Sequence, residues 1–271
     1  MTDTTLNRLL IPGRAGTLLA ELGDRAVCYD LYDKAGAPVY HDLAGQDTHE
    51  VRELLTLVRA VPGPVLDLAA GSGRLTMPLL ASGRDVTALE ISGSMLKLLD
   101  ARLAGAPEAL RNRCTTVQAD MSDFALGRKF GVIVLGTTSV SLLDVPGRKG
   151  LYHSVHAHLA PGGRFLLSTV DLAAGGRAPA ETEVEFTAAS GRRYRMFEYW
   201  VPGAEARTVT VFPAVIGEAQ VDVCTTSIRV LSADQLEEEL RQSGFAVCSR
   251  SLLPDIGMRH HSVLIEAQVT A

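Results

Sequence analysis

The sequence is poor in several features that mark particular classes of protein. Its 271 residues include one tryptophan and four cysteines, and only 5% are aromatic. The cysteines are widely spaced without a C-x-x-C pair, so the sequence predicts neither a disulfide framework nor a zinc knuckle. It has no run near the ~18 apolar residues of a membrane span, and no basic segment leading into an apolar run near its start. We therefore expect a cytoplasmic protein with no membrane partner.

Positive charge is also scarce. Lysine and arginine number 26 against 31 aspartate and glutamate residues, which gives a formal net charge of −5, and the basic residues are scattered along the chain. Proteins that bind nucleic acid usually carry a clustered basic patch. We therefore expect no nucleic-acid partner, and the acidic balance mildly favours a cationic substrate.

The seven histidines do not predict a metal site. His153, His156 and His158 share one predicted helix, but no further ligand accompanies them at a spacing typical of a metal centre. Exposed positions on that helix account for all three. We expect no bound metal.

Short apolar runs alternate with helix-period segments from residue 64 onward, and this pattern predicts a parallel sheet built from βαβ units. The fold class is therefore α/β. The predicted strands are 65–68, 85–90, 115–118, 132–135 and 164–170, with helices at 74–81, 92–103 and 151–159 between them.

The chain on either side of this core has a different pattern. In residues 181–230, apolar and polar residues alternate with period two between turn signals. This pattern predicts three or four antiparallel strands inserted after the fifth strand. A capping box at Ser232 begins another helix, and two further strands return to the main sheet. We expect three parts: a helical N-terminal lid at 1–60, a core at 61–172 and 231–271, and an antiparallel insertion at 178–230 that forms a substrate cover.

The segment V-L-D-L-A-A-G-S-G-R, residues 65–74, carries the most specific chemical signal. An apolar strand runs into Gly71 and Gly73 at the mouth of a helix, where backbone N–H groups can approach a ligand closely. A dinucleotide fingerprint would place a third glycine at the position of Thr76. Glu90 ends the second strand 19 residues after Gly71, where a carboxylate accepts ribose hydroxyls. The turn alone leaves the choice of nucleoside cofactor open.

From about residue 61 to 171, the sequence resembles the class I S-adenosylmethionine-dependent methyltransferases. The matching segments are the glycine-rich turn, A-L-E-I-S-G-S-M-L, Q-A-D-M, F-G-V-I-V-L-G and H-L-A-P-G-G-R-F-L-L, in that order. The resemblance implies a Rossmann-like, doubly wound, mostly parallel sheet and S-adenosylmethionine as the cofactor. The implied cofactor-binding residues are Asp67, Ala69, Gly71, Gly73, Glu90, Ile91, Met95, Asp120, Met121, Leu135 and Gly136.

The resemblance also implies a role for several of these residues. Glu90 would accept the ribose hydroxyls, Ile91 and Met95 would lie beside the adenine, and Leu135 and Gly136 beneath the methionine part. Asp120 would face the adenine amino group, and Met121 would supply a backbone contact. Ala69 stands where the family often has its first glycine. Arg74 is either a contact for the cofactor carboxylate or a solvated arginine.

The insertion and the C-Y-D-L-Y stretch near the start look like the branch of this family that methylates amines. That branch includes sugar N,N-dimethyltransferases, glycine or sarcosine N-methyltransferases, and the daptide type that dimethylates a peptide N-terminus. These relatives often carry a histidine where this sequence has Ser141. The resemblance implies N-methylation of a small-molecule or peptide amine in natural-product (ribosomal peptide) biosynthesis. A small-molecule O-methyltransferase and a non-catalytic S-adenosylmethionine-binding protein remain alternatives.

Candidate acceptor residues are mainly aromatic. The candidates for a catalytic group are Tyr32, His49 and Ser141. For the oligomeric state, we consider a homodimer. The candidate walls of the acceptor site are Tyr29, Tyr32, Tyr40, Thr137, Tyr199 and Trp200.

Overall fold

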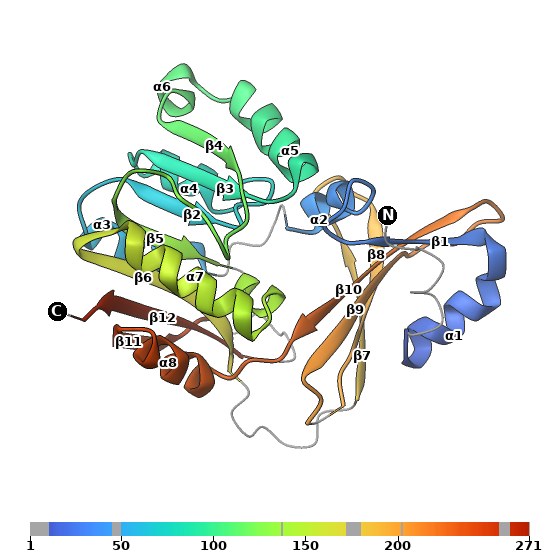
Figure 1. Ribbon diagram of the computed structural model, residues 1–271. Coiled ribbons are helices and arrows are strands. Elements are labelled where there is room, and N and C mark those ends of the chain that lie inside the picture. Colours follow the sequence, from blue (N-terminus) through green and yellow to red (C-terminus); the bar gives the residue numbers. More distant parts are fainter. Residues whose placement is uncertain are drawn as a thin grey trace. The chain divides into compact units, whose positions relative to one another are not determined.

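The protein divides into two compact units in a computed structural model (Figure 1). The five-stranded unit comprises Met1–Asp47 with Gly176–Val230, and the seven-stranded unit comprises Thr48–Gly175 with Leu231–Ala271. The structure describes residues 11–44, 50–136, 138–171, 180–201, 203–254 and 261–270. Thr137 and His49 lie outside the described residues.

The seven-stranded unit contains a mostly parallel sheet, which confirms the predicted α/β class. Its strands follow the order β11-β12-β6-β5-β2-β3-β4, and β2 pairs in parallel with both β3 and β5. β12 is antiparallel to β6 and to β11. The strands are β2 (Val65–Leu68), β3 (Val86–Glu90), β4 (Cys114–Gln118), β5 (Phe130–Leu135), β6 (Leu159–Asp171), β11 (Phe245–Leu252) and β12 (His261–Val269).

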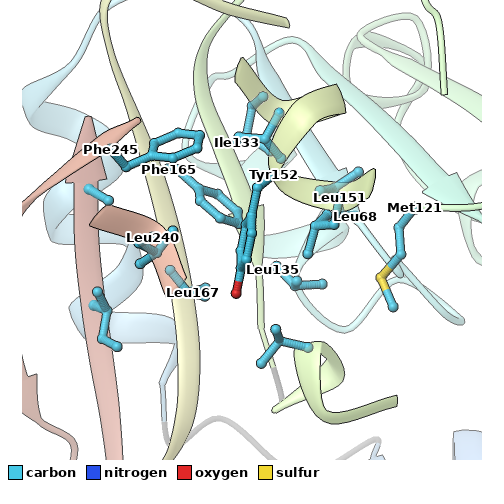
Figure 2. Close-up of a cluster of buried hydrophobic side chains, with 14 of the residues drawn as sticks. Leu68, Met121, Ile133, Leu135, Leu151, Tyr152, Phe165, Leu167, Leu240 and Phe245 are labelled. Atoms are coloured by element: carbon cyan, nitrogen blue, oxygen red, sulfur yellow. The ribbon is translucent and has the colours of Figure 1, made fainter. Parts of the chain in front are cut away.

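Helices cover both faces of this sheet, because successive strand side chains point to opposite sides. Leu66 and Leu68 of β2 pack in one buried cluster with residues of α7 and α8, and Figure 2 shows this cluster. Val65 of the same strand packs in a second cluster with residues of α3, α4 and α5. The helices are α3 (Val51–Ala60), α4 (Thr76–Ala81), α5 (Gly93–Ala104), α6 (Glu108–Arg111), the 3₁₀ turn η3 (Ser139–Leu142), α7 (Val145–His158) and α8 (Ala233–Gln242).

The five-stranded unit has its own sheet, in the order β1-β10-β9-β8-β7. The strands β7 to β10 are antiparallel neighbours, as the alternating pattern predicts, and β1 pairs in parallel with β10. Leu19 of α1 packs with Phe197, Phe212 and Val223 on one face of the sheet. The elements are α1 (Gly13–Leu22), the 3₁₀ turn η2 (Gly23–Arg25), β1 (Ala26–Asp30), α2 (Ala37–Ala44), β7 (Glu181–Thr187), β8 (Arg193–Tyr199), β9 (Ala206–Pro213) and β10 (Val221–Arg229).

The contacts group the N-terminal region differently from the expected lid at 1–60. Residues 50–60 belong to the seven-stranded unit, because Leu54 and Val58 of α3 pack in one buried cluster with Val65. Residues 26–30 form a strand rather than helix, since β10 supplies their backbone partners. In the described part of the chain, no helix is both long and apolar enough to cross a membrane.

Candidate active site

The predicted cofactor residues follow the central strands of the seven-stranded unit. The strand order reverses at β2, whose neighbours are β3 and β5. In open α/β sheets, ligands bind beyond the carboxyl ends of the strands at such a switch point. Asp67 stands near the end of β2, Glu90 ends β3 and Leu135 ends β5, while Asp120 comes two residues after β4. The structure therefore brings these residues to one edge of one sheet.

The turn after β2 has the backbone conformation that its glycines predict. Gly71 and Gly73 have φ of 56° and 87°, and a Cβ at Gly73 would lie 2.5 Å from Cδ1 of Leu99. Glycine is therefore required at position 73 both for the backbone conformation and for close packing on α5. The backbone of Ala69 also lies in the left-handed region, with φ of 51°. This conformation is strained for alanine and explains why a glycine suits that position.

Glu90 has the geometry expected of a ribose acceptor. Its side chain is buried, and its two carboxylate oxygens accept hydrogen bonds from the N–H groups of Gly71 and Ser92, at 2.9 and 2.8 Å. These bonds fix the carboxylate at the mouth of the glycine-rich turn. Each oxygen keeps further acceptor capacity, because an ionised carboxylate has about four lone-pair sites. Two neighbouring ribose hydroxyls match this arrangement.

The residues proposed for the adenine end differ in their exposure. Ile91 is 62% exposed, whereas Met95 and Met121 are buried. Asp120 is held by Ser122, whose N–H and hydroxyl both donate to its Oδ1, at 2.7 and 2.8 Å. The exposed side chain of Ile91 is available for contact with a flat ring, while the methionines pack mainly within the protein.

Asp67 is a buried carboxyl with an unusual ionisation. The hydroxyl of Thr76 donates a hydrogen bond to its Oδ2 at 2.6 Å. Burial raises its pKa to about 7, and the negative charges of Glu50 and Glu90 act in the same direction, while Thr76 and Arg74 oppose them. Asp67 therefore changes its charge near neutral pH.

The structure adds one residue that the sequence does not single out, Glu50. It stands at the N-cap position of α3 without a side-chain capping hydrogen bond, is wholly buried, and accepts a hydrogen bond from Nη2 of Arg74. A Cβ placed on Gly136 would lie 2.7 Å from Oε1 of Glu50 and 2.4 Å from Cδ1 of Leu75. The ion pair therefore lies against Gly136, the residue that follows β5.

The candidate acceptor residues fall mostly in the other unit. Tyr29, Tyr32, Tyr40, Tyr199 and Trp200 belong to the five-stranded unit, and Ser141 is buried in the seven-stranded unit. The rings of Tyr32 and Tyr40 meet edge to face, with centroids 5.2 Å apart. The indole N–H of Trp200 donates to the carbonyl oxygen of Ala204 at 3.0 Å. Burial raises the pKa of Tyr29, and Asp222 and Asp33 add to the effect.

The five-stranded unit also contains a cavity of about 590 Å³. Its lining includes Val39 of α2, Arg192, Tyr194, Val215 and Asp222. The five tyrosine and tryptophan candidates of this unit are not part of that lining. Among the residues that the structure describes, no group of three or more histidine, cysteine, aspartate or glutamate side chains could hold a metal ion.

Comparisons with known proteins identify the family. The family described as "Methyltransferase domain" matches residues 65–163. The dTDP-3-amino-3,4,6-trideoxy-alpha-D-glucopyranose N,N-dimethyltransferase of Streptomyces venezuelae is 31% identical over 141 residues, 52% of this chain and 54% of that relative. The chain thus matches about half the length of this curated relative.

Similarity to solved structures extends over nearly the whole chain. The crystal structure of the glycopeptide N-methyltransferase MtfA complexed with S-adenosylmethionine is 40% identical, with a TM-score of 0.69, and the match covers 96% of this chain and 99% of MtfA. The CcbJ methyltransferase of Streptomyces caelestis, with 20% identity and a TM-score of 0.75 over 89% of this chain and 99% of CcbJ, shows similarity of fold alone.

The chain belongs to the class I S-adenosylmethionine-dependent methyltransferases, and the two relatives with the highest identities reported above are N-methyltransferases. This confirms the predicted family and sets the dinucleotide interpretation aside. Solved structures of MtfA contain S-adenosylmethionine, sinefungin or S-adenosylhomocysteine, and S-adenosylmethionine is the cofactor that the family uses. The residues present fit it, because Gly73 leaves the turn free of a side chain and Glu90 presents two fixed carboxylate oxygens beside it.

Replacing Glu90 with alanine is expected to weaken binding of S-adenosylhomocysteine, the demethylated cofactor, at least ~10-fold, since hydrogen bonds to a charged group contribute ~1.5–3 kcal/mol. Calorimetric titration would measure the affinity. Glu108→Ala, which removes an exposed carboxylate from α6 of the same unit, is the matched control and should bind normally. Unchanged affinity in a folded Glu90→Ala variant would remove Glu90 from the site.

Proposed function

We propose that this protein transfers the methyl group of S-adenosylmethionine to an amine nitrogen of a peptide or glycopeptide natural product. The observation that carries this proposal is the 40% identity to the glycopeptide N-methyltransferase MtfA, over 96% of this chain and 99% of that one. The match to an N,N-dimethyltransferase supports nitrogen as the acceptor atom. A peptide N-terminus, and a ribosomal origin of the peptide, are the finer parts of the proposal.

In this proposal, the seven-stranded unit binds and orients the cofactor. Glu90 accepts hydrogen bonds from the ribose hydroxyls, and Asp120 faces the adenine amino group. The turn with Gly71 and Gly73 lets the protein backbone approach the cofactor closely. The bound cofactor supplies a methyl group on a sulfonium, which is already a good leaving group. The protein's contribution is to align the acceptor with the S–CH₃ bond and to exclude water, which can lower the barrier by several kcal/mol.

We propose that no histidine base acts from the turn after β5, where relatives often carry one. Ser141 stands where such a base is often found in relatives and is only 1% exposed. A neutral serine hydroxyl is a very weak base, and a neighbouring base would first have to remove its own proton before it could take one from the acceptor. An amine acceptor can avoid this requirement, because an α-amine with a pKa of ~7.7–8.0 is partly neutral at physiological pH.

We assign selection of the acceptor to the five-stranded unit. It holds the aromatic side chains Tyr29, Tyr32, Tyr40, Tyr199 and Trp200, of which the rings of Tyr32 and Tyr40 are in contact. Aromatic rings with a polar tip suit the mixed apolar and polar surface of a peptide. We also propose a lid role for residues 1–60, a substrate-cover role for residues 178–230, and a homodimer.

The decisive experiment compares matched acceptors with isotopically labelled cofactor. A peptide with a free N-terminal amine is incubated beside the same peptide acetylated at its N-terminus, and the label is located by mass spectrometry. The proposal predicts label on nitrogen of the free peptide and none on the acetylated one. An amino sugar is the second acceptor, because the N,N-dimethyltransferase from Streptomyces venezuelae is named for one.

Other outcomes of this experiment contradict the proposal in different ways. Label on a hydroxyl oxygen of both peptides would favour the O-methyltransferase. Label on the amino sugar alone would exclude a peptide acceptor. Binding of S-adenosylhomocysteine without transfer to any acceptor would favour a non-catalytic binding protein.

A further inference from the structure

The cavity of the five-stranded unit lies on the sheet face opposite the core that packs against α1. Tyr194 of β8 is the register partner of Pro213 of β9, and both side chains line the cavity. Cys224 of β10 pairs with Val211 of β9, so Asp222, two residues earlier on β10, projects from this same face. The other face of the sheet holds the apolar core of the unit.

Hydrogen bonds to Asp42 hold α2 beside the cavity. Val39 of this helix is part of the lining. Asp42 accepts hydrogen bonds from the N–H of Ser190 at 2.9 Å, from the hydroxyl of Ser190, and from the hydroxyl of Tyr194 at 3.1 Å. Burial raises the pKa of Asp42, but these bonds and the charge of Arg192 outweigh burial and bring the pKa below its usual value. One wall of the cavity is therefore a helix fixed in place by an ionised carboxylate.

Both arginines of the lining already have partners within the protein. Arg192 hydrogen-bonds the hydroxyl of Tyr194 and faces the negative charge of Asp42. Arg193 forms an ion pair with Glu185 of β7. Because the protein itself balances these two positive charges, an anionic ligand would gain little from them.

Asp222 gives the cavity a negative charge that the protein does not balance. It is exposed, and its Oδ1 accepts a hydrogen bond from the side-chain amide of Gln220 at 2.9 Å. Within the described ranges, no lysine or arginine forms an ion pair with Asp222. Acidic residues also outnumber basic ones in the five-stranded unit as a whole. Both the local charge and the wider field therefore favour a cationic ligand.

The rest of the lining is largely apolar. Val39, Pro213 and Val221 contribute to it. Val215 also lines the cavity and, at 77%, is the most exposed large apolar side chain in the described part of the protein. Small-molecule sites are clefts of about 300–1,000 Å³, mostly apolar with a few polar groups, and the volume of about 590 Å³ falls in this range. The cavity therefore fits a ligand that joins an apolar group to a cation.

We propose that this cavity binds a basic segment of the peptide acceptor. A lysine or arginine side chain of the peptide contacts Asp222, and a neighbouring apolar side chain lies against Val215 and Pro213. This inference rests on the proposed peptide acceptor and deepens it, because it names a basic peptide as the substrate class. The site is separate from the tyrosine and tryptophan candidates of the same unit, none of which lines the cavity.

The experiment measures binding of two short peptides to the full-length protein by calorimetric titration. The probes are acetyl-leucyl-arginine amide and acetyl-leucyl-citrulline amide, whose neutral urea has nearly the shape of the guanidinium. We expect the arginine peptide to bind about three- to fivefold more tightly at low ionic strength, as for an exposed ion pair. The preference should shrink in high salt, because salt screens exposed charges.

Three variants test the assigned contacts. Asp222→Asn should remove the preference for the arginine peptide, whereas Glu218→Gln should keep it. Glu218 is the matched control, because it is an exposed carboxylate of the same β9–β10 loop that does not line the cavity. Val215→Ser should weaken both peptides by the same factor of about two to four and keep the preference, since it removes only apolar contact. The ratio of the two affinities on one variant does not depend on how much of that variant is folded.

Four outcomes would overturn the inference. They are the absence of saturable binding of either peptide, an arginine preference that persists in Asp222→Asn, an equal loss of preference in Glu218→Gln, and tighter binding of acetyl-leucyl-glutamate amide than of the arginine peptide. The last result would assign the cavity to an anionic segment.

These outcomes are distinguishable from a failure of the proposed function. The acetylated probes have no free N-terminal amine, so their binding is measured without methyl transfer. Label on a peptide amine, with no binding of either probe, would overturn the cavity site and leave the proposed function standing. Label on the amino sugar alone would overturn the peptide acceptor, whatever the affinities of the probes.

Discussion

We expect the natural protein to lose stability between about pH 4 and pH 7, and we expect replacement of Asp67 with asparagine to remove this pH-dependent loss. The pKa of Asp67 is raised from 3.8 to about 7 in the folded chain, chiefly because the carboxyl is buried. In this range the unfolded chain has lost the proton while the folded chain still holds it. Stability falls with rising pH wherever the folded state binds more protons, and it levels off above the folded pKa.

The expected size of this effect is large for one side chain. The difference between the two pKa values corresponds to a loss of up to ~4 kcal/mol in the free energy of unfolding. Asparagine cannot ionise, but its amide oxygen can still accept the hydrogen bond that Thr76 donates to Asp67. The variant should therefore be more stable than the natural protein above pH 7 and should show a flatter pH profile.

The measurement is urea unfolding at a series of pH values, followed by circular dichroism at 222 nm. Most helical residues in the described part of the chain belong to the seven-stranded unit, whereas the single tryptophan, Trp200, belongs to the other unit and would report on that unit. Asp85→Asn is the matched control, because Asp85 is exposed just before β3. A slope between pH 5 and pH 7 that persists in Asp67→Asn would contradict the assignment.

The parts of the site that the sequence predicts are those with local causes. The turn conformation at Gly71 and Gly73 follows from the absence of a Cβ, and the strand before it follows from an apolar run of four residues. The place of Glu90 at the end of β3 follows from the 19 residues that separate it from Gly71 along the sequence. Short runs such as these do not require knowledge of distant partners.

Features that depend on distant partners could not be predicted in this way. Glu50 lies in an amphipathic segment, where a charged residue indicates a solvent-facing position, and its partner Arg74 is 24 residues away. The strand β1 has five residues and acquires its partner only when β10 folds beside it.

His158 shows the same limit. It was expected on an exposed helix position, but it is buried. Its Nδ1 contacts the carbonyl oxygen of Ser154 at 2.7 Å, and its Nε2 accepts a hydrogen bond from the N–H of Leu126 at 2.9 Å. The Leu126 partner comes from a loop 32 residues earlier in the chain, and the periodicity of the helix cannot predict this contact.

For an amine acceptor, kcat/KM should rise close to tenfold for each pH unit until the amine is neutral, and then level off. A protonated amine has no lone pair with which to attack the methyl group, so only the neutral fraction reacts. For a peptide α-amine, the midpoint of the rise should lie near pH ~8, and for a lysine-like amine near pH ~10. Rates are measured with saturating cofactor and limiting acceptor.

Asp67 complicates the interpretation of a single profile, because its own pKa of about 7 lies near the expected midpoint. Two acceptors that differ only in amine pKa resolve this difficulty. If the amine supplies the titration, the midpoint should move with the acceptor, by about two pH units between an α-amine and a lysine-like amine. If a group of the protein supplies it, the midpoint should stay at the same pH for both.

The Asp67→Asn variant completes the comparison. This variant removes the carboxyl of Asp67 while leaving the acceptor unchanged, so the midpoint should remain where the amine places it. A midpoint that is the same for both acceptors, and that disappears in this variant, would assign the pH dependence to Asp67. That result would refute the amine's own deprotonation as the source of the nucleophile, because the reactive lone pair would then depend on a carboxyl of the cofactor site.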